Sequence, residues 1–203
     1  MTKKLFLTLS IITLLTSCSA RRTAVQDPAT FDEGVVINGI RWATRNVDMP
    51  GTFAASPESP GMFFQWNRKK GWNAIDEEVE GWDNSIPEGT TWYAENDPCP
   101  AGWRVPTREE LQNLFNSISE IRWVILNGIN GHIFGDAYNQ IFFPAAGVRV
   151  NGTLYHAGYV GFFWGSSSND IDSAQGLMIV VSDRIGYCGF DKVGGFSIRC
   201  VAK

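Results

Sequence analysis

The stretch "DPCPAGWRVPTREEL" (residues 97–111) carries the clearest structural signals in the chain. Cys99 lies between two prolines, whose rings fix their own φ angles and restrict the residue that precedes each of them. Thr107, followed three residues later by Glu110, is typical of a capping box, in which each side chain accepts a hydrogen bond from the other residue's backbone amide. The stretch therefore predicts a rigidly held cysteine shortly before the start of a helix.

The predicted helix has one apolar side. Its apolar residues recur at i, i+3, i+4 and i+7, the spacing of a single helix face: Leu111, Leu114, Phe115 and Ile118. This face is expected to pack on a core. A second, weaker helix is predicted near residues 119–126.

The rest of the chain is rich in strand signals. Asn-Gly pairs at residues 38–39 and 151–152 stand between runs of β-branched and aromatic residues, which predicts two β-hairpins. Further β-type runs lie at residues 61–66, 141–147, 161–167, 174–181 and 194–201. One or two helices packed on antiparallel strands with long loops indicate an α+β fold.

The composition is that of a globular domain. The chain has 203 residues, of which 44% are hydrophobic and 19% charged. The formal net charge is -4 at pH 7, and the sequence contains no basic stripe. A nucleic acid is therefore not expected as a partner.

The N-terminus has the features of an export signal. Two lysines precede an apolar run over residues 5–15, which is too short to span a bilayer and is typical of a secretory signal peptide. The run ends in "LTSC", which resembles a bacterial lipobox; the alternative is a plain signal peptide beside an unrelated cysteine. The lipobox predicts a signal peptide over 1–17, a lipid anchor on Cys18 with palmitate-type acylation, a tether over 18–34 and a domain over 35–203. It also predicts export by the Sec route to the outer membrane or cell surface.

Three cysteines remain after the predicted anchor: Cys99, Cys188 and Cys200. An exported protein meets an oxidising environment, so a disulfide is expected. Three cysteines allow three single pairings, and each pairing leaves one thiol over.

The segment of residues 71–98 contains eight acidic residues and no lysine or arginine. It has too little periodicity for a strand or a long helix and predicts a long loop. Trp72, Trp82 and Trp92, together with Asp83, are candidate ligand-binding residues, because tryptophan rings can stack on sugars or anchor a partner. The alternative is that the tryptophans only pin the loop to the domain.

No metal site or catalytic group is predicted. The spacings of zinc sites and of calcium-binding EF-hand loops are absent, although the acids of the loop could hold calcium without such a motif. No G-x-S-x-G motif is present, and His132 and His156 are expected at the surface or in turns. The sequence therefore predicts a protein that is not an enzyme.

Several motifs together resemble those of the Fibrobacter succinogenes major paralogous domain, in the same order over residues 35–201: "INGIRWATRNV", "GMFFQWNRKKGW", "DPCPAGWRVPTREEL", "GINGHIFG", "FPAAGVR", "GFFWGSSS" and "GGFSIRCV". The resemblance implies a secreted or surface lipoprotein with a C-type lectin-like fold. Together with the lack of catalytic and metal-binding motifs, it favours a non-catalytic module for binding or adhesion, with a glycan or a cell-surface protein as partner. Four tryptophans fall within these motifs and are expected in the core: Trp42, Trp66, Trp103 and Trp164.

The resemblance also implies a disulfide between Cys99 and Cys200, because the cysteine of the "CPAGW" motif pairs with that of the last strand in this family. Cys188 matches no family motif and is expected to be a small buried apolar residue. The tripeptides of calcium-dependent lectins are absent, which argues against calcium-dependent sugar binding. Two alternatives stay open: a structural subunit of a surface assembly, and an enzyme of the sulfatase-modifying type, which would need a cysteine pair.

Overall fold

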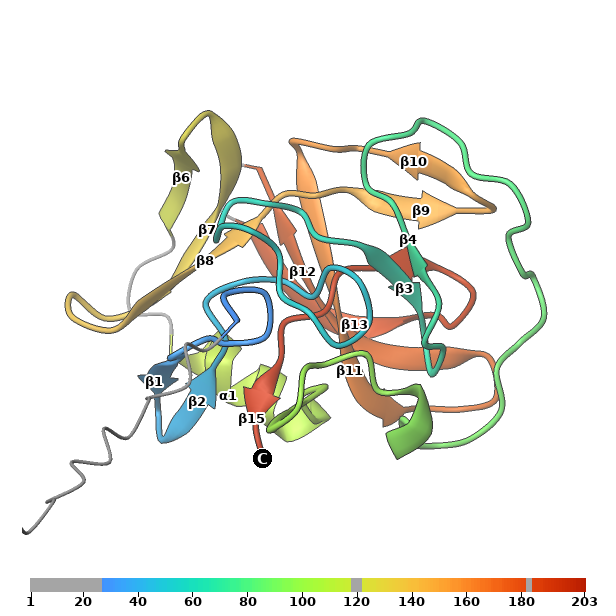
Figure 1. The fold of residues 1–203 in the computed structure, drawn as a ribbon, viewed down its shortest axis with the longest axis horizontal. Helices are drawn as coiled ribbons and strands as arrows, with labels where there is room; N and C mark the ends of the chain where they lie inside the picture. Colours follow the sequence, from blue (N-terminus) through green and yellow to red (C-terminus); the bar gives the residue numbers. More distant parts are fainter. Residues whose placement is uncertain (1–26, 118–121, 182–183) are drawn as a thin grey trace, which may run out of the picture.

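The computed structural model describes residues 27–117, 122–181 and 184–203 (Figure 1). Residues 1–26, where the signal peptide, Cys18 and most of the tether are predicted, lie outside these ranges. The described ranges contain no helix that is long and apolar enough to cross a membrane.

The fold is mostly β. Strands make up 42% of the structure and helices 7%. Within the described residues there is one α-helix, α1 (Arg108–Asn116), and one short 3-10 helix, η1 (Ala94–Asn96). The predicted α+β, C-type lectin-like fold with one or two helices packed on strands is therefore wrong, because several antiparallel sheets dominate instead.

Four antiparallel sheets form the described structure (Figure 1). The first has the order β1 (Val35–Ile37), β2 (Ile40–Trp42), β15 (Val201–Ala202) and β5 (Trp103–Arg104). The second has the order β10 (Thr153–Tyr155), β9 (Val148–Val150), β14 (Gly195–Phe196), β3 (Phe63–Gln65) and β4 (Gly71–Trp72). The third has the order β11 (Val160–Ser168), β12 (Ser173–Val180) and β13 (Arg184–Asp191). The fourth has the order β6 (Arg122–Leu126), β7 (Ile129–Gly135) and β8 (Gln140–Pro144).

Both predicted Asn-Gly hairpins are confirmed. Residues 38–39 join β1 to β2, and residues 151–152 join β9 to β10. All four of these residues have positive φ angles, which is the backbone that a two-residue type I′ turn requires.

A third Asn-Gly hairpin, at residues 127–128, joins β6 to β7 and was not predicted from the sequence. The second helix expected near residues 119–126 is wrong over its described part, because residues 122–126 form β6. The stretch "WVI" favours an extended backbone, and the turn that follows pairs it with β7. Residues 119–121 lie outside the described ranges.

Helix α1 begins as the capping box predicts. The Thr107 hydroxyl accepts a hydrogen bond from the Glu110 amide (3.3 Å), and the Glu110 carboxylate accepts one from the Thr107 amide (2.8 Å). Leu111 and Leu114 are fully buried, and the helix packs against β11, β12 and β13. The apolar face is thus confirmed for its described residues.

Strand β11 separates two apolar clusters, because neighbouring side chains of a strand point to opposite faces. Phe163 belongs to the cluster beneath α1, which includes Leu111 and Leu114. Trp164 belongs to an aromatic cluster on the other side, where it stacks on Phe196 with ring centroids 4.0 Å apart. The four tryptophans expected in the core are all buried: Trp42, Trp66, Trp103 and Trp164.

The implied disulfide is confirmed. Cys99 and Cys200 are bonded, with their Cα atoms 6.1 Å apart, and the bond joins the segment before α1 to the segment before β15. The backbone amide of Cys99 also donates to the Asp97 carboxylate (2.9 Å), which holds the cysteine in place. Cys188 is a free cysteine and is exposed on β13, so the expectation of a buried residue is wrong.

Candidate functional site

The acidic segment of residues 71–98 runs as a long loop along one side of the molecule (Figure 1). It contains only β4 at its start and η1 near its end. The predicted loop is therefore confirmed, and its course decides where the candidate binding residues lie.

Buried polar side chains of the domain hold this loop from beneath. The Arg149 guanidinium is fully buried and donates to the Asn73 carbonyl (2.9 Å). The Gln65 side-chain amide donates to the Asp83 carbonyl (2.6 Å), and that of Asn67 donates to the Glu88 carbonyl (2.9 Å). These bonds fix the loop backbone at widely spaced points, because a carbonyl left without a partner at a buried position costs free energy.

The three candidate tryptophans do not converge on one site. Trp72 is buried and Trp82 half-buried, with ring centroids 5.0 Å apart. Trp92 is buried elsewhere, 5.9 Å from the ring centroid of Trp66, and its indole N–H donates to the Asn96 carbonyl (3.0 Å). Rings as buried as those of Trp72 and Trp92 offer no open stacking surface, so both support the pinning interpretation.

Asp83 is exposed, whereas Trp72 and Trp92 are buried and Trp82 is half-buried. Its carboxylate forms an ion pair with Arg68 and accepts a hydrogen bond from the Ser85 amide (2.9 Å). The Ser85 contact shapes the turn that follows Trp82, and the Arg68 contact joins the loop to the segment between β3 and β4.

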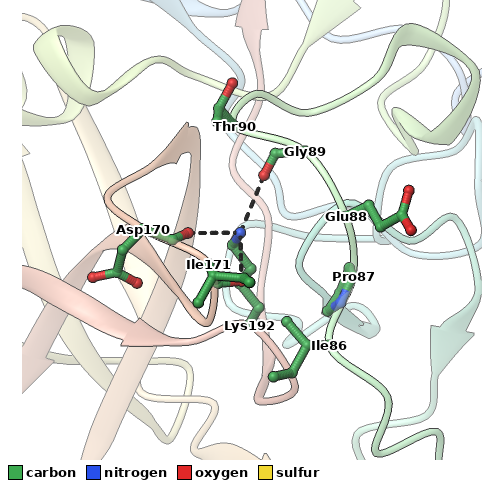
Figure 2. A pocket seen from close by; sticks show the side chains of 8 residues that line it. All are labelled: Ile86, Pro87, Glu88, Gly89, Thr90, Asp170, Ile171 and Lys192. Carbon is green, nitrogen blue, oxygen red and sulfur yellow. Dashed lines mark hydrogen bonds between the residues drawn. The ribbon is translucent and has the colours of Figure 1, made fainter.

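A hollow of about 540 Å³ lies where the loop approaches the turn between β11 and β12 (Figure 2). Residues 86–90 form one side of the hollow, Asp170 and Ile171 form the other, and Lys192 lies between them. Ile171 is 81% exposed and Ile86 is 51% exposed. Two large apolar side chains are thus presented to solvent on facing sides of one open hollow, which is characteristic of binding surfaces.

Lys192 joins the two sides of the hollow from within. Its ammonium group donates to the carbonyls of Gly89 (3.1 Å), Asp170 (3.0 Å) and Ile171 (3.1 Å), as Figure 2 shows. The residue is only 1% exposed, and its nitrogen also lies 4.6 Å from the ring centroid of Trp66. All three donors of the ammonium group are used by these carbonyls, so the cation serves the architecture of the hollow.

Burial lowers the pKa of the Lys192 ammonium, and the negative charges of Asp170 and Asp172 act in the opposite direction. Carbonyl oxygens that accept its hydrogen bonds also favour the charged form. The buried Lys192 ammonium thus joins the two sides of the hollow and is not available to a ligand.

Both sides of the hollow are attached to the sheet of β11–β13. The Thr90 carbonyl accepts a hydrogen bond from the Ser168 amide (2.9 Å) at the end of β11. On the opposite side, the Asp170 carboxylate accepts one from the Ser173 amide (2.9 Å) and thereby closes the turn that carries Ile171. The exposed isoleucines thus sit on loops with fixed backbones, an arrangement that suits a binding site.

The rim of the hollow is acidic. Glu88, Asp170 and Asp172 are exposed, and Figure 2 shows the carboxylates of Glu88 and Asp170 on opposite outer sides. Hydrogen bonding to Asp170, followed by the charge of Asp170, raises the pKa of the Asp172 carboxyl, whereas the Ser173 amide lowers the pKa of Asp170. None of the three forms an ion pair within the described part of the chain, and the Lys192 ammonium is the one cation of the lining that interacts with the charges of Asp170 and Asp172.

Within the described residues, no group of three or more His, Cys, Asp and Glu side chains is placed to hold a metal ion.

The histidines occupy different environments. His132 is fully buried on β7 and accepts a hydrogen bond from the Arg122 amide (3.1 Å), so the expectation of a surface or turn position is wrong for it. His156 follows β10 in a left-handed backbone with a φ of 58°, which confirms a turn. Neither histidine lines the hollow.

The residues that form the hollow were not singled out from the sequence. A local signal does exist for two of them: Ile86 and Ile171 are isolated apolar residues in stretches that are otherwise polar, "DNSIPEG" and "SNDIDS". No local signal marks Lys192, because its three carbonyl partners are 21, 22 and 103 residues away in sequence.

Comparison of the chain with protein-family models, with curated proteins and with solved structures finds no match. The resemblance to the Fibrobacter succinogenes major paralogous domain therefore stays a prediction, carried by the quoted motifs alone.

Proposed function

We propose that this protein is a non-catalytic binding module of the bacterial cell envelope, and that it captures its partner at the hollow between residues 86–90 and the turn at Asp170 and Ile171. The observation that carries the proposal is the pair of exposed isoleucines that face each other across the hollow. Exposed apolar side chains gain little in the free protein and gain free energy when a partner covers them. The fixed backbones beneath them reduce the entropy that binding would otherwise cost.

The proposal includes an anchor at the outer membrane or cell surface through a lipid on Cys18. The support is the order of basic residues, apolar run and lipobox-like tetrapeptide, together with the family resemblance. We expect the Cys18→Ala variant to leave the membrane fraction or to remain unprocessed, as measured by detergent phase partitioning and mass spectrometry. Unchanged partitioning with lipid would remove the anchor from the proposal.

A non-catalytic role is supported by the disulfide. The sulfatase-modifying chemistry considered from the sequence requires a pair of free thiols, and Cys200 is bonded to Cys99. Cys188 is left as a free cysteine on the surface, where partial desolvation raises the pKa of its thiol and disfavours the reactive thiolate.

The binding proposal is tested with charge insertion into the hollow. The full chain, solubilised in detergent, is screened against a glycan array and a phage-displayed peptide library, and each ligand found is retested on variants. We expect Ile171→Asp and Ile86→Asp to abolish capture while the melting temperature changes little, because both side chains are exposed. Ile75→Asp is the matched control, since Ile75 is 87% exposed in the same loop and does not line the hollow. Equal effects of all three changes would contradict the proposal.

A second candidate function, a structural subunit of a surface assembly, is favoured by β13. This strand of eight residues pairs with β12 on one side and ends its sheet on the other within the described chain. It contains no proline and no lysine, the residues that commonly protect an edge strand from pairing with another chain. We expect assembly through β13 to appear as oligomers in light scattering, and Gly186→Pro to abolish them; a monomer at all concentrations would exclude this candidate.

A further inference from the structure

The hollow combines an apolar interior with an anionic rim, and this combination restricts the chemistry of its partner. Its interior is formed by the isoleucines and the ring of Pro87. Glu88 and Asp170 lie at its rim and Asp172 follows in the same turn; none of the three forms an ion pair with a described basic side chain. The single cation of the lining, Lys192, has its donors occupied by three carbonyls.

We propose that the partner is a cationic polypeptide segment. It inserts an aliphatic or aromatic side chain between Ile86 and Ile171 and places lysine or arginine side chains against Glu88, Asp170 and Asp172. This inference rests on the proposed function, because it names the class of partner that the same hollow binds.

Charge complementarity is the first argument for this partner. The rim belongs to a larger acidic region, since the loop of residues 71–98 carries eight acids and no lysine or arginine. Such a region attracts cations and repels polyanions, so nucleic acids and anionic membrane surfaces fit it poorly. A basic segment gains from the same field both as it approaches and once it is bound.

The lining of the hollow is the second argument. Glycan sites commonly offer an exposed aromatic ring on which a sugar can stack, and no aromatic residue lines this hollow. Aliphatic walls instead favour an apolar side chain of a protein partner. The volume of about 540 Å³ lies within the range of roughly 300–1,000 Å³ that is common for ligand pockets, so it suits a side chain with part of its backbone.

The paired carboxylates at the turn are the third argument. Asp170 and Asp172 share one turn, where the Asp172 amide donates to the Asp170 carboxylate (3.3 Å), and the negative charge of Asp170 disfavours that of Asp172. A basic side chain that binds between them relieves this repulsion. Because both carboxylates are exposed, a partner reaches them without any rearrangement of the turn.

The two parts of the site leave different kinetic signatures. Rim charges act mainly on the association rate and on its dependence on salt, whereas a buried apolar contact acts mainly on the dissociation rate. Neutralising the rim is therefore expected to slow association by about tenfold or more at low salt. Charging Ile171 is expected to abolish binding at every salt concentration.

The test uses the full chain in detergent and a phage-displayed library of random peptides as the probe. Selected peptides are expected to carry lysine or arginine next to an apolar residue. Their association is measured by surface plasmon resonance on the triple variant Glu88→Gln, Asp170→Asn, Asp172→Asn. Asparagine keeps an oxygen that can accept the Ser173 amide, so the turn is retained.

The matched control removes the same number of charges at exposed positions outside the hollow, in the loop that also carries Glu88: Glu77→Gln, Glu78→Gln and Glu80→Gln. We expect the association rate at low salt to fall in the rim variant and to stay close to that of the wild type in the control variant. Equal losses in both variants would show unspecific attraction and overturn the inference.

Two other outcomes separate this inference from the proposed function. Selected ligands that are acidic, neutral or glycan in nature, but lose binding in Ile171→Asp, would overturn the cationic partner and leave the binding module intact. If no ligand of any class depends on Ile86 or Ile171, the proposed function falls, and this inference falls with it.

Discussion

Helix α1 contacts the rest of the protein through leucine side chains, whereas the loop of residues 71–98 is held mainly by side chains that donate hydrogen bonds to its carbonyls. Leu111 and Leu114 lie in one apolar cluster with residues of β11 and β12. From buried positions, Arg149 donates to the loop carbonyls of Asn73 and Asp76, and Lys192 donates to that of Gly89. Apolar packing therefore holds α1 in position, whereas hydrogen bonds from buried side chains hold the loop.

This difference predicts how a mutation in each region changes stability. An apolar cluster is shared by many side chains, so a void in it lowers the stability of the whole domain. A loop held at separate points can open at one of them while the sheets remain folded. We therefore expect global effects from the helix and local effects from the loop.

The largest effect is expected at Leu114. Leu114→Ala removes fully buried methyl groups beneath α1 and should lower the free energy of unfolding by about 2–5 kcal/mol, as measured by urea denaturation. Gln112→Ala on the exposed side of the same helix is the control and should change stability little. Similar results for both variants would break the comparison, because α1 would then not depend on its apolar face.

A smaller and more local effect is expected at Lys192. Lys192→Met removes the donor of the Gly89 and Ile171 carbonyls and one of the two donors of the Asp170 carbonyl, which should cost about 1–3 kcal/mol. Hydrogen exchange should rise at residues 86–90 and at the turn, with little change in α1. Exposed Lys69→Met serves as control; a uniform rise across the domain would show that the loop and the core unfold together.

The cap of α1 offers a finer measurement. Thr107→Ala removes the hydroxyl that accepts the Glu110 amide and should cost about 1 kcal/mol. The loss should be seen in thermal unfolding and should not alter exchange in the loop. If hydrogen exchange instead rises only at the start of α1 and the melting temperature is unchanged, the start of α1 opens locally, as we expect for the loop.

The smallest effect concerns the charge of Glu110. Burial opposes its ionisation, but hydrogen bonds from Arg104 and from the Thr107 amide outweigh burial and lower the pKa of Glu110. A lowered pKa gives stability that is present at neutral pH and is lost as the pH falls through the folded-state value. Since the pair is partly exposed, the contribution is about 0.5 kcal/mol.

Glu110→Gln keeps one side-chain oxygen for the cap but removes the charge and the acceptor of one of the two Arg104 hydrogen bonds, as protonation of the carboxylate also does. The variant should melt slightly below the wild type at neutral pH and at the same temperature as the wild type in strong acid. A difference that persists in strong acid would assign the effect to altered packing.

The same division explains what the sequence could predict. Helix α1 and two hairpins follow from residues close together in the chain: the capping box, the apolar spacing and the Asn-Gly pairs. The position of Cys99 opposite Cys200 came from the family resemblance, and the structure confirms it. Local patterns and a few quoted motifs were therefore sufficient for these elements.

The remaining features depend on partners far away in sequence. Residues 122–126 carry an apolar pattern that suits a helix or a strand, and pairing with β7 decides for strand. The sheets outweigh the single helix, which is why the α+β prediction failed. The hollow itself exists because Lys192 reaches Gly89 across 103 residues, a contact that no local pattern contains.

The position of β15 has a consequence for the order in which the protein can fold. This strand lies between β2 and β5, and Val201 pairs with both Trp42 and Arg104. A ribosome adds roughly 5–20 residues per second, so about 8–30 s separate the synthesis of Trp42 from that of Val201. During that interval the hairpin of β1 and β2 has no neighbour on its open side. The first-made sheet of the protein is thus also the last to close, and its N-terminal hairpin stays accessible to chaperones and proteases until the chain is complete.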